Sequence, residues 1–262
     1  MREAVVEAAR FLAGRCTEAV TLGDVADHVS YSPFHLARAF ERAHGQPPGQ
    51  FLAAHRFQRA KQLLLATDER VVDICHEVGF SSVGTFTTRF TAAVGQSPAR
   101  FRQLPDVLVD DPPQPLIVPG TARGGGTVTG TVRLSAAAQA AVGTASVYVG
   151  LFHKRTARGF PVCGTLLGET GDFLLVDVPP GAYWLLASAL PARDGPVAQL
   201  VPRRGISGAA REPVHVTPCR PVHHREVWLD VAPEWDAPVL VALPPLASPR
   251  NAPRPVLLPT GS

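Results

Sequence analysis

Residues 77–90, EVGFSSVGTFTTRF, decide how the first half of the chain folds. Gly79 interrupts one helical pattern, and small hydroxyl residues open the next. Phe86 and Phe90 stand four residues apart, so both lie on one face of a helix, while the hydroxyl residues and the arginine around them are left for the outer face. This pattern predicts a helix-turn-helix whose second helix is apolar on one side and polar on the other.

The same pattern occurs earlier in the chain, at an offset of 50 residues. GQPPGQF (45–51) recurs as GQSPARF (95–101), and Leu36 and Phe40 recur as the bulky pair Phe86 and Phe90. Segment 48–67 joins the two copies and would be a helix of about 30 Å at 1.5 Å per residue. A rod of that length could set two reading helices about one DNA turn apart.

Apolar residues recur at helical spacing through the first half. Thr21 with Asp24 fits a capping box, and Ser32 and Ser97, each followed by proline, fit N-caps. Seven helices are therefore predicted, at about 2–13, 21–29, 32–44, 48–66, 70–78, 82–93 and 98–103.

Several longer stretches follow one another in a specific order over about 100 residues: HLARAFERAHGQPPGQFL, RFQRAKQLL, VVDICHEVGF, TFTTRF and GQSPARFRQ. With them, residues 1–104 resemble the DNA-binding domain of the AraC/XylS family of bacterial transcription regulators. The resemblance implies a sequence-specific DNA-binding regulator in which the helix after each turn enters a major groove. Because the sequence contains no nucleophile elbow, phosphate loop or paired-carboxylate motif, an enzyme is not expected.

The resemblance also implies which residues contact DNA. Base contacts would fall to Phe34, His35, Ala37 and Arg38 in the first unit and to Val83, Gly84, Thr87 and Thr88 in the second. The predicted DNA-binding set further includes Ser32, Arg42, Ser82, Thr85 and Arg89.

The two units differ in their candidates for base reading. Arg38 is the strongest candidate, because arginine can donate to guanine O6 and N7 together. The second unit departs from the family pattern: Thr88 stands where an arginine is usual, and Arg89 lies about 100° further around the helix. Arg89 is therefore a candidate for a phosphate contact instead.

Other side chains have two open interpretations. Phe34 is expected to be exposed, whereas four phenylalanines are expected in the core: Phe40, Phe80, Phe86 and Phe90. Each of five arginines could contact phosphate or be ordinary solvated surface: Arg42, Arg56, Arg59, Arg100 and Arg102.

The second half has a different composition, because only 4 of the 26 prolines lie before residue 105. Short apolar runs separated by turn signals predict strands at 126–134, 145–152, 172–178 and 182–190. The expected fold class is an N-terminal all-α double helix-turn-helix domain followed by a C-terminal all-β sandwich. The expected boundaries are a DNA-binding domain at 1–104, a linker at 105–126, a β domain at 127–246 and an extended tail at 247–262.

The glycine-spaced first strand and the VPPGAYWL turn (178–185) are similar to a carboxypeptidase regulatory-like, transthyretin-type β-sandwich. Two roles stay open for this half: a sensor with a pocket lined by Tyr148, Tyr183 or Trp184, and a domain for dimerisation or for docking a protein partner. HVTPCRPVHH (215–224) spaces His, Cys and His by four, but its prolines exclude a regular helix, so surface histidines are favoured over a metal site.

Composition sets the remaining expectations. A net charge of +3 permits a polyanionic partner without requiring one. The sequence contains no run of the roughly 18 apolar residues that a membrane span needs, so a cytoplasmic protein without membrane contact is expected. No catalytic residue, cofactor or metal is predicted. Double-stranded DNA is the expected partner, with a small-molecule effector, a homodimer and, for an activator, RNA polymerase left open.

Overall fold

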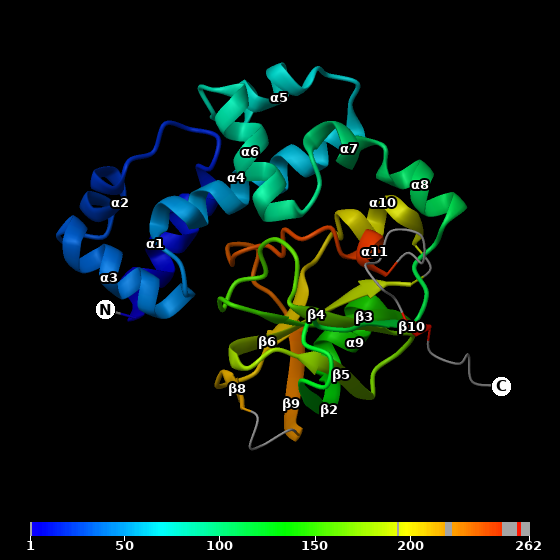
Figure 1. Cartoon of the computed structure of the whole chain (residues 1–262). Helices are drawn as coiled ribbons and strands as arrows, with labels where there is room; N and C mark the ends of the chain where they lie inside the picture. The colour runs from blue at the N-terminus through cyan, green and yellow to red at the C-terminus, as the bar shows by residue number, and fades with distance from the viewer. Residues whose placement is uncertain (1, 193, 218–221, 248–255, 258–262) are drawn as a thin grey trace. The chain divides into compact units, whose positions relative to one another are not determined.

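The computed structural model describes residues 2–192, 194–217, 222–247 and 256–257, which divide into two compact units (Figure 1). The helical unit contains Met1–Arg102 together with a short distant segment, Pro233–Leu240, called the return segment below. The β unit contains Gln103–Ala232 and Val241–Ser262.

All seven predicted helices of the helical unit are present to within one residue at each end. Their starts carry the expected caps: Thr21 and Asp24 form a capping box, and Ser32 and Ser97 each accept a backbone hydrogen bond. The helices are α1 (Arg2–Gly14), α2 (Leu22–His28), α3 (Pro33–His44), α4 (Pro48–Ala66), α5 (Val71–Glu77), α6 (Val83–Val94) and α7 (Pro98–Arg102).

Helix α4 contributes to the cores of both halves of this unit. Phe51 joins the core cluster that α1, α2 and α3 build. Phe57 lies two turns further on, with its ring centroid 5.3 Å from that of Phe80 and 5.7 Å from that of Phe90. The expected core phenylalanines are all buried, which confirms the predicted inner faces.

The β unit is built around one ten-stranded sheet with the order β10-β1-β4-β3-β6-β7-β9-β2-β5, and β8 pairs with β6. Strands β2 and β9 pair in parallel, whereas the other pairs are antiparallel. The strands are β1 (Leu116–Val118), β2 (Gly126–Leu134), β3 (Ala145–Phe152), β4 (Cys163–Leu167), β5 (Asp172–Val178), β6 (Gly181–Pro191), β7 (Ile206–Ala209), β8 (Val214–Val216), β9 (Val222–Val231) and β10 (Val256–Leu257).

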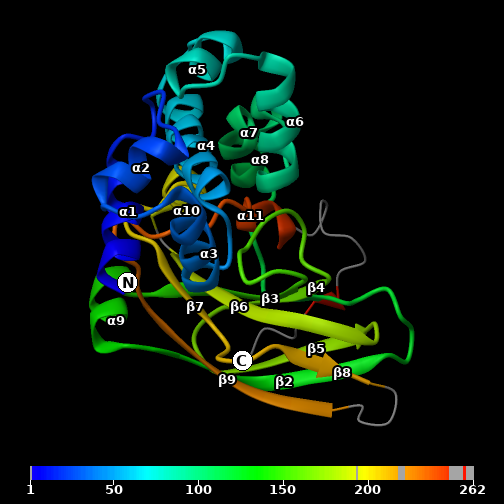
Figure 2. The ribbon, with the colours of Figure 1, turned by 90° about the vertical axis from the view of Figure 1, so that its left-hand side faces the viewer.

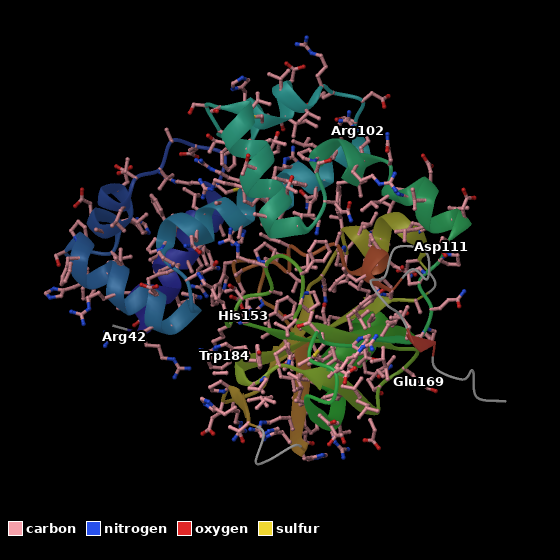
Figure 3. The ribbon with its side chains drawn as sticks, in the orientation of Figure 1. Arg42, Arg102, Asp111, His153, Glu169 and Trp184 are labelled. Atoms are coloured by element: carbon pink, nitrogen blue, oxygen red, sulfur yellow. The ribbon has the colours of Figure 1, made fainter. Side chains whose placement is uncertain are left out.

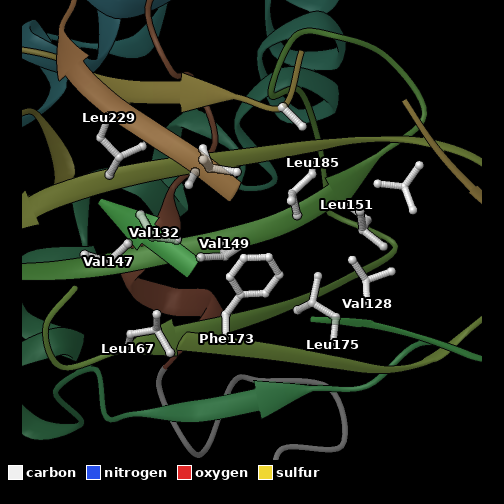
Figure 4. Close-up of a cluster of buried hydrophobic side chains, with 14 of the residues drawn as sticks. Val128, Val132, Val147, Val149, Leu151, Leu167, Phe173, Leu175, Leu185 and Leu229 are labelled. Atoms are coloured by element: carbon white, nitrogen blue, oxygen red, sulfur yellow. The ribbon is translucent and has the colours of Figure 1, made fainter. Parts of the chain in front are cut away.

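The sheet folds over so that two layers enclose a core, with β3 and β6 in one layer and β2 and β5 in the other (Figure 2). Side chains from both layers meet around Phe173 (Figure 4). Strand β9 approaches β2 so closely that a Cβ at Gly130 would lie 1.7 Å from the carbonyl oxygen of Arg225. Glycine at this position is therefore required by the close approach of two backbones.

The described residues of the β unit also form four helices, so the second half is β-rich and not purely β. They are α8 (Leu104–Asp110), α9 (Ala136–Val142), α10 (Gly195–Leu200) and α11 (Leu243–Leu246). The β-rich character of this half is confirmed, whereas its similarity to a transthyretin-type sandwich stays a prediction.

The expected linker at 105–126 differs from the structure, because it contains most of α8 and all of β1. Proline misled the sequence interpretation here: Pro105 occupies the first turn of α8, where its missing N–H would have had no helical partner. The expected β domain at 127–246 likewise includes the return segment, which belongs to the helical unit. Most of the expected tail at 247–262 lies outside the described residues, but Val256–Leu257 forms β10 against β1.

Candidate nucleic-acid interface

Helix α3 presents the predicted residues of the first unit on its outer side. Ser32 caps the helix by accepting a hydrogen bond from the His35 N–H at 3.4 Å, and its Oγ lies 3.1 Å from His35 Nδ1. Phe34 is 66% exposed, and the Arg38 guanidinium carbon lies 5.6 Å from its ring centroid. Ala37 is half-buried at the edge of this face.

Arg42 continues the outer side of α3 one turn beyond Arg38 (Figure 3). Both guanidinium-bearing residues are exposed, whereas Leu36 and Phe40 on the opposite side are fully buried. The first unit therefore offers an arginine surface on a helix whose other side is fixed in the core.

Helix α6 presents a surface of small and hydroxyl residues. Ser82 caps it by accepting from the Thr85 N–H at 3.3 Å. Gly84, Thr85, Thr88 and Arg89 are exposed. Val83 and Thr87 are half-buried, and the Thr87 carbonyl accepts a hydrogen bond from the Thr91 hydroxyl at 2.7 Å.

Arg89 lies beside the core and not apart from it. Its guanidinium carbon is 5.7 Å from the ring centroid of Phe80, and that of Arg56 is 5.6 Å from the same ring. Arg89 remains exposed on its outer side, so α6 carries one cation next to a row of threonines.

Arg56, Arg59 and Arg102, three of the arginines with two open interpretations, each contact a named group of the protein. Arg56 donates to the carbonyl oxygens of Cys16 at 2.6 Å, Glu18 at 2.7 Å and Gly79 at 2.8 Å. Arg102 donates to Leu64 and Glu69 carbonyls, and Arg59 pairs with Glu77 at 3.3 Å. Arg56 thus holds the segment after α1 and the turn after α5 against α4. No local pattern in the sequence signals this structural role.

Helix α4 also holds two titratable side chains with lowered pKa values, half-buried His55 and fully buried Lys61. Burial lowers the pKa of His55 to about 4, against the opposing effect of a hydrogen bond with the Trp235 backbone. Burial lowers the pKa of Lys61 to about 7, and Lys61 Nζ donates to the Leu240 carbonyl at 3.4 Å. Neither residue was in the predicted set, because an isolated histidine and lysine carry no periodic signal.

The candidate pocket residues of the β unit do not share one face. Tyr183 is buried in the core, whereas Tyr148 and Trp184 lie on the other side of the sheet. Burial raises the pKa of Tyr148 above its usual range, and its hydroxyl has no hydrogen-bond partner among the residues that the structure describes. Among the described residues no cluster of three or more His, Cys, Asp or Glu side chains could hold a metal, and Cys219 lies outside them.

No helix in the described part of the chain is both long and apolar enough to cross a membrane.

Comparisons with known proteins match the helical half. Residues 25–104 fit a family described as a helix-turn-helix domain. The transcriptional activator AarP of Providencia stuartii is 34% identical over 92 residues, covering 35% of this chain and 68% of that protein. AdaA of Bacillus subtilis, a bifunctional transcriptional activator and DNA repair enzyme, is 36% identical over 88 residues, covering 34% of this chain and 42% of that protein.

Among solved structures, the C-terminal domain of the response regulator AraT from Geobacillus stearothermophilus is 29% identical. The match covers 38% of this chain and 84% of the AraT domain, with a TM-score of 0.36.

Two helix-turn-helix units, each with a capped second helix that is buried on one side and exposed on the other, define a DNA-binding module. The chain belongs to the AraC/XylS family of helix-turn-helix transcription regulators.

Proposed function

We propose that the protein is a sequence-specific transcription regulator that reads two successive major grooves of duplex DNA, one with α3 and one with α6. The observation that carries the proposal is the pairing of an exposed outer face with a fully buried inner face on both helices. Helix α4 has 19 residues, so at 1.5 Å per residue it spans about 28 Å and matches the scale of one DNA turn.

The roles of individual residues follow from their chemistry. Arg38 donates to guanine O6 and N7, and Arg42 binds a phosphate on the flank of the same groove. Phe34 and Ala37 offer apolar contact to thymine methyl groups, His35 lies against base edges, and Ser32 donates to phosphate oxygens of the DNA backbone. In the second unit Ser82, Thr85 and Arg89 contact phosphate, and Val83, Gly84, Thr87 and Thr88 lie against base edges. Phosphate contacts then supply affinity, and base contacts supply sequence choice.

The β unit assembles or controls the DNA-binding unit. A small-molecule effector or dimerisation through this unit would change DNA occupancy, and RNA polymerase would be contacted if the protein activates. The cytoplasm, where bacterial DNA lies, is the expected location. The alternative is an interaction protein whose β unit docks a protein partner and senses no ligand. Ligand-induced stabilisation of the whole chain favours control, whereas partner-dependent recruitment without any ligand response favours docking.

Selection of bound genomic fragments followed by footprinting tests the proposal. Full-length protein is compared with Arg38→Ala and with Arg211→Ala, an exposed arginine of the β unit, at two salt concentrations. We expect protection over two successive major grooves and a loss of about 1 to 3 kcal/mol in base discrimination at one position for Arg38→Ala alone. Sequence-blind binding by the wild type would refute the proposal.

A second variant asks whether the second unit reads bases. Thr88→Arg places a guanidinium where the family pattern has one, so we expect a new guanine preference in the α6 half of the selected site. An unchanged site in this variant would show that α6 contributes shape and phosphate contacts only.

A further inference from the structure

The return segment reaches the end of the first recognition helix. Residues 233–236 form a turn, in which the Asp236 N–H donates to the Pro233 carbonyl at 2.9 Å. This turn presents Trp235 to the helical unit, where it packs with Ala237 against the core built by α1, α2 and α3.

Trp235 and Asp236 both contact His44, the last residue of α3. The Trp235 ring stands edge-on to the His44 ring, with centroids 6.3 Å apart and planes at 89°. Asp236 Oδ1 lies 3.9 Å from His44 Nδ1. His44 in turn packs on Phe40 of α3, at 4.5 Å, and on Phe51 of α4, at 5.1 Å.

Two further contacts fix the segment on the neighbouring helices. The Arg10 guanidinium of α1 lies 5.8 Å from the centroid of the Trp235 ring. The carbonyl of Leu240, at the end of the segment, accepts the hydrogen bond of buried Lys61 on α4. The segment is therefore attached at several points along the helical unit and does not merely pass over it.

We propose that Trp235 and Asp236 are positioning residues for DNA recognition: through His44 they fix the C-terminal end of α3 and so set how its outer face enters the groove. The inference rests on the proposed function and adds a regulatory route to it. Strand β9 ends at Val231, two residues before the segment begins, so the chain leads directly from the β sheet to the recognition helix. A displacement of β9 would therefore move the return segment, and through it the end of α3, without any contact between β9 and DNA.

The test compares specific and non-specific DNA affinity of full-length variants, each corrected for its active fraction by stoichiometric titration. Trp235→Ala should weaken binding to the selected site about tenfold, the scale of one lost base contact, and weaken random-sequence binding much less. Trp235→Phe retains an aromatic edge and should recover most of the loss. The matched control is Trp228→Ala, since Trp228 is 58% exposed on β9 and lies over Arg133 of the same unit.

The outcomes separate positioning from general stability. Equal loss on both DNAs, or no loss at all, would overturn the inference. If Trp235→Ala does not fold, Asp236→Asn decides, because its carboxylate is half exposed: a two- to fivefold drop in the specific affinity alone is expected, and no drop refutes positioning. A wild type without sequence preference would sink the proposed function and the inference together, whereas intact preference in Trp235→Ala sinks only the inference.

Discussion

The two helix-turn-helix units share a backbone frame and differ in their outer surfaces. Both second helices begin at a serine cap, Ser32 or Ser82, and both end at a left-handed glycine, Gly45 with φ 69° and Gly95 with φ 82°. The outer surfaces diverge, with Arg38 in one unit and Thr88 at the equivalent place in the other. The comparison teaches that the repeated residues are those that fix the backbone, while the exposed residues are free to differ.

The turns show a second difference. The residue that follows the first helix of each unit by two positions has a positive φ in both cases, 56° for Ser30 and 84° for Gly79. A left-handed conformation is unfavourable for serine and costs glycine nothing, so the first turn is the more strained of the two.

The largest predicted effect concerns helix α4, which holds two titratable groups whose pKa values are lowered by burial, Lys61 and His55. Lys61 has a pKa of about 7 when folded and 10.5 as its ordinary value, so stability should rise as pH increases from 7 to 10.5, because only the unfolded chain keeps the proton there. The shift corresponds to roughly 3 to 5 kcal/mol. Lys61→Met should abolish that rise. It should also stabilise the protein at pH 7 by about 2 kcal/mol, a net value that includes the cost of leaving the Leu240 carbonyl without its partner.

Urea unfolding at pH 7, 8.5 and 10 measures this prediction. The control is Lys154→Met, which changes the other lysine of the chain, exposed in the loop after β3. A wild type whose stability is flat over this range would contradict it. His55 acts in a different window: its pKa of about 4 predicts that stability is lost as pH falls from 6.5 towards 4, and removing the histidine should flatten that acid limb.

The next effect concerns the turn residues with positive φ in the two helix-turn-helix units, Gly79 and Ser30. Gly79→Ala should destabilise by about 2 kcal/mol, because φ is positive and the new Cβ would lie 3.0 Å from both the Thr17 carbonyl oxygen and the Arg56 guanidinium. Ser30→Gly should stabilise by about 0.5 to 1 kcal/mol by relieving strain in the other turn. Thermal unfolding measures both, with Gly49→Ala as a control in open space. Equal effects of the same sign would show that the two turns do not differ as their φ angles indicate.

Local and repeated features of the fold could be read from the sequence. Caps, helix periods and the faces of phenylalanines such as Phe86 depend on residues a few positions apart, so a sequence pattern contains them. The predicted strand at 145–152 coincides with β3 for the same reason. The outward side chains of α3 and α6 followed from the repeat together with the family resemblance.

Long-range features could not be read in this way. Arg56 donates hydrogen bonds to the backbone carbonyls of residues 16, 18 and 79, and a backbone carbonyl has no sequence signature. Trp235 returns to the helical unit after about 130 residues of the β unit, and nothing near it indicates where it docks. Helix α8 was missed because the prolines around it were interpreted as a linker, although Pro105 lies in its first turn.

The smallest predicted change in stability concerns a position that is equivalent in the two helix-turn-helix units. Phe34 and Gly84 occupy equivalent places, 50 residues apart, near the start of α3 and α6. The space around Gly84 is open, since a Cβ there would meet nothing closer than Ser82 Oγ at 4.0 Å. Gly84→Ala should therefore stabilise the free protein by about 0.5 kcal/mol through helix propensity.

DNA binding should move in the opposite direction if Gly84 lets α6 approach closely. An added methyl group would hold the helix away from base edges, so we expect a loss of about threefold to tenfold in specific affinity from a protein that is more stable. Phe34→Ala is the matched variant: it should leave stability unchanged, because the ring is exposed, and weaken binding through α3. A more stable Gly84→Ala protein with full affinity would mean that α6 does not approach DNA at this position, and that the second unit contributes mainly through Arg89 and phosphate.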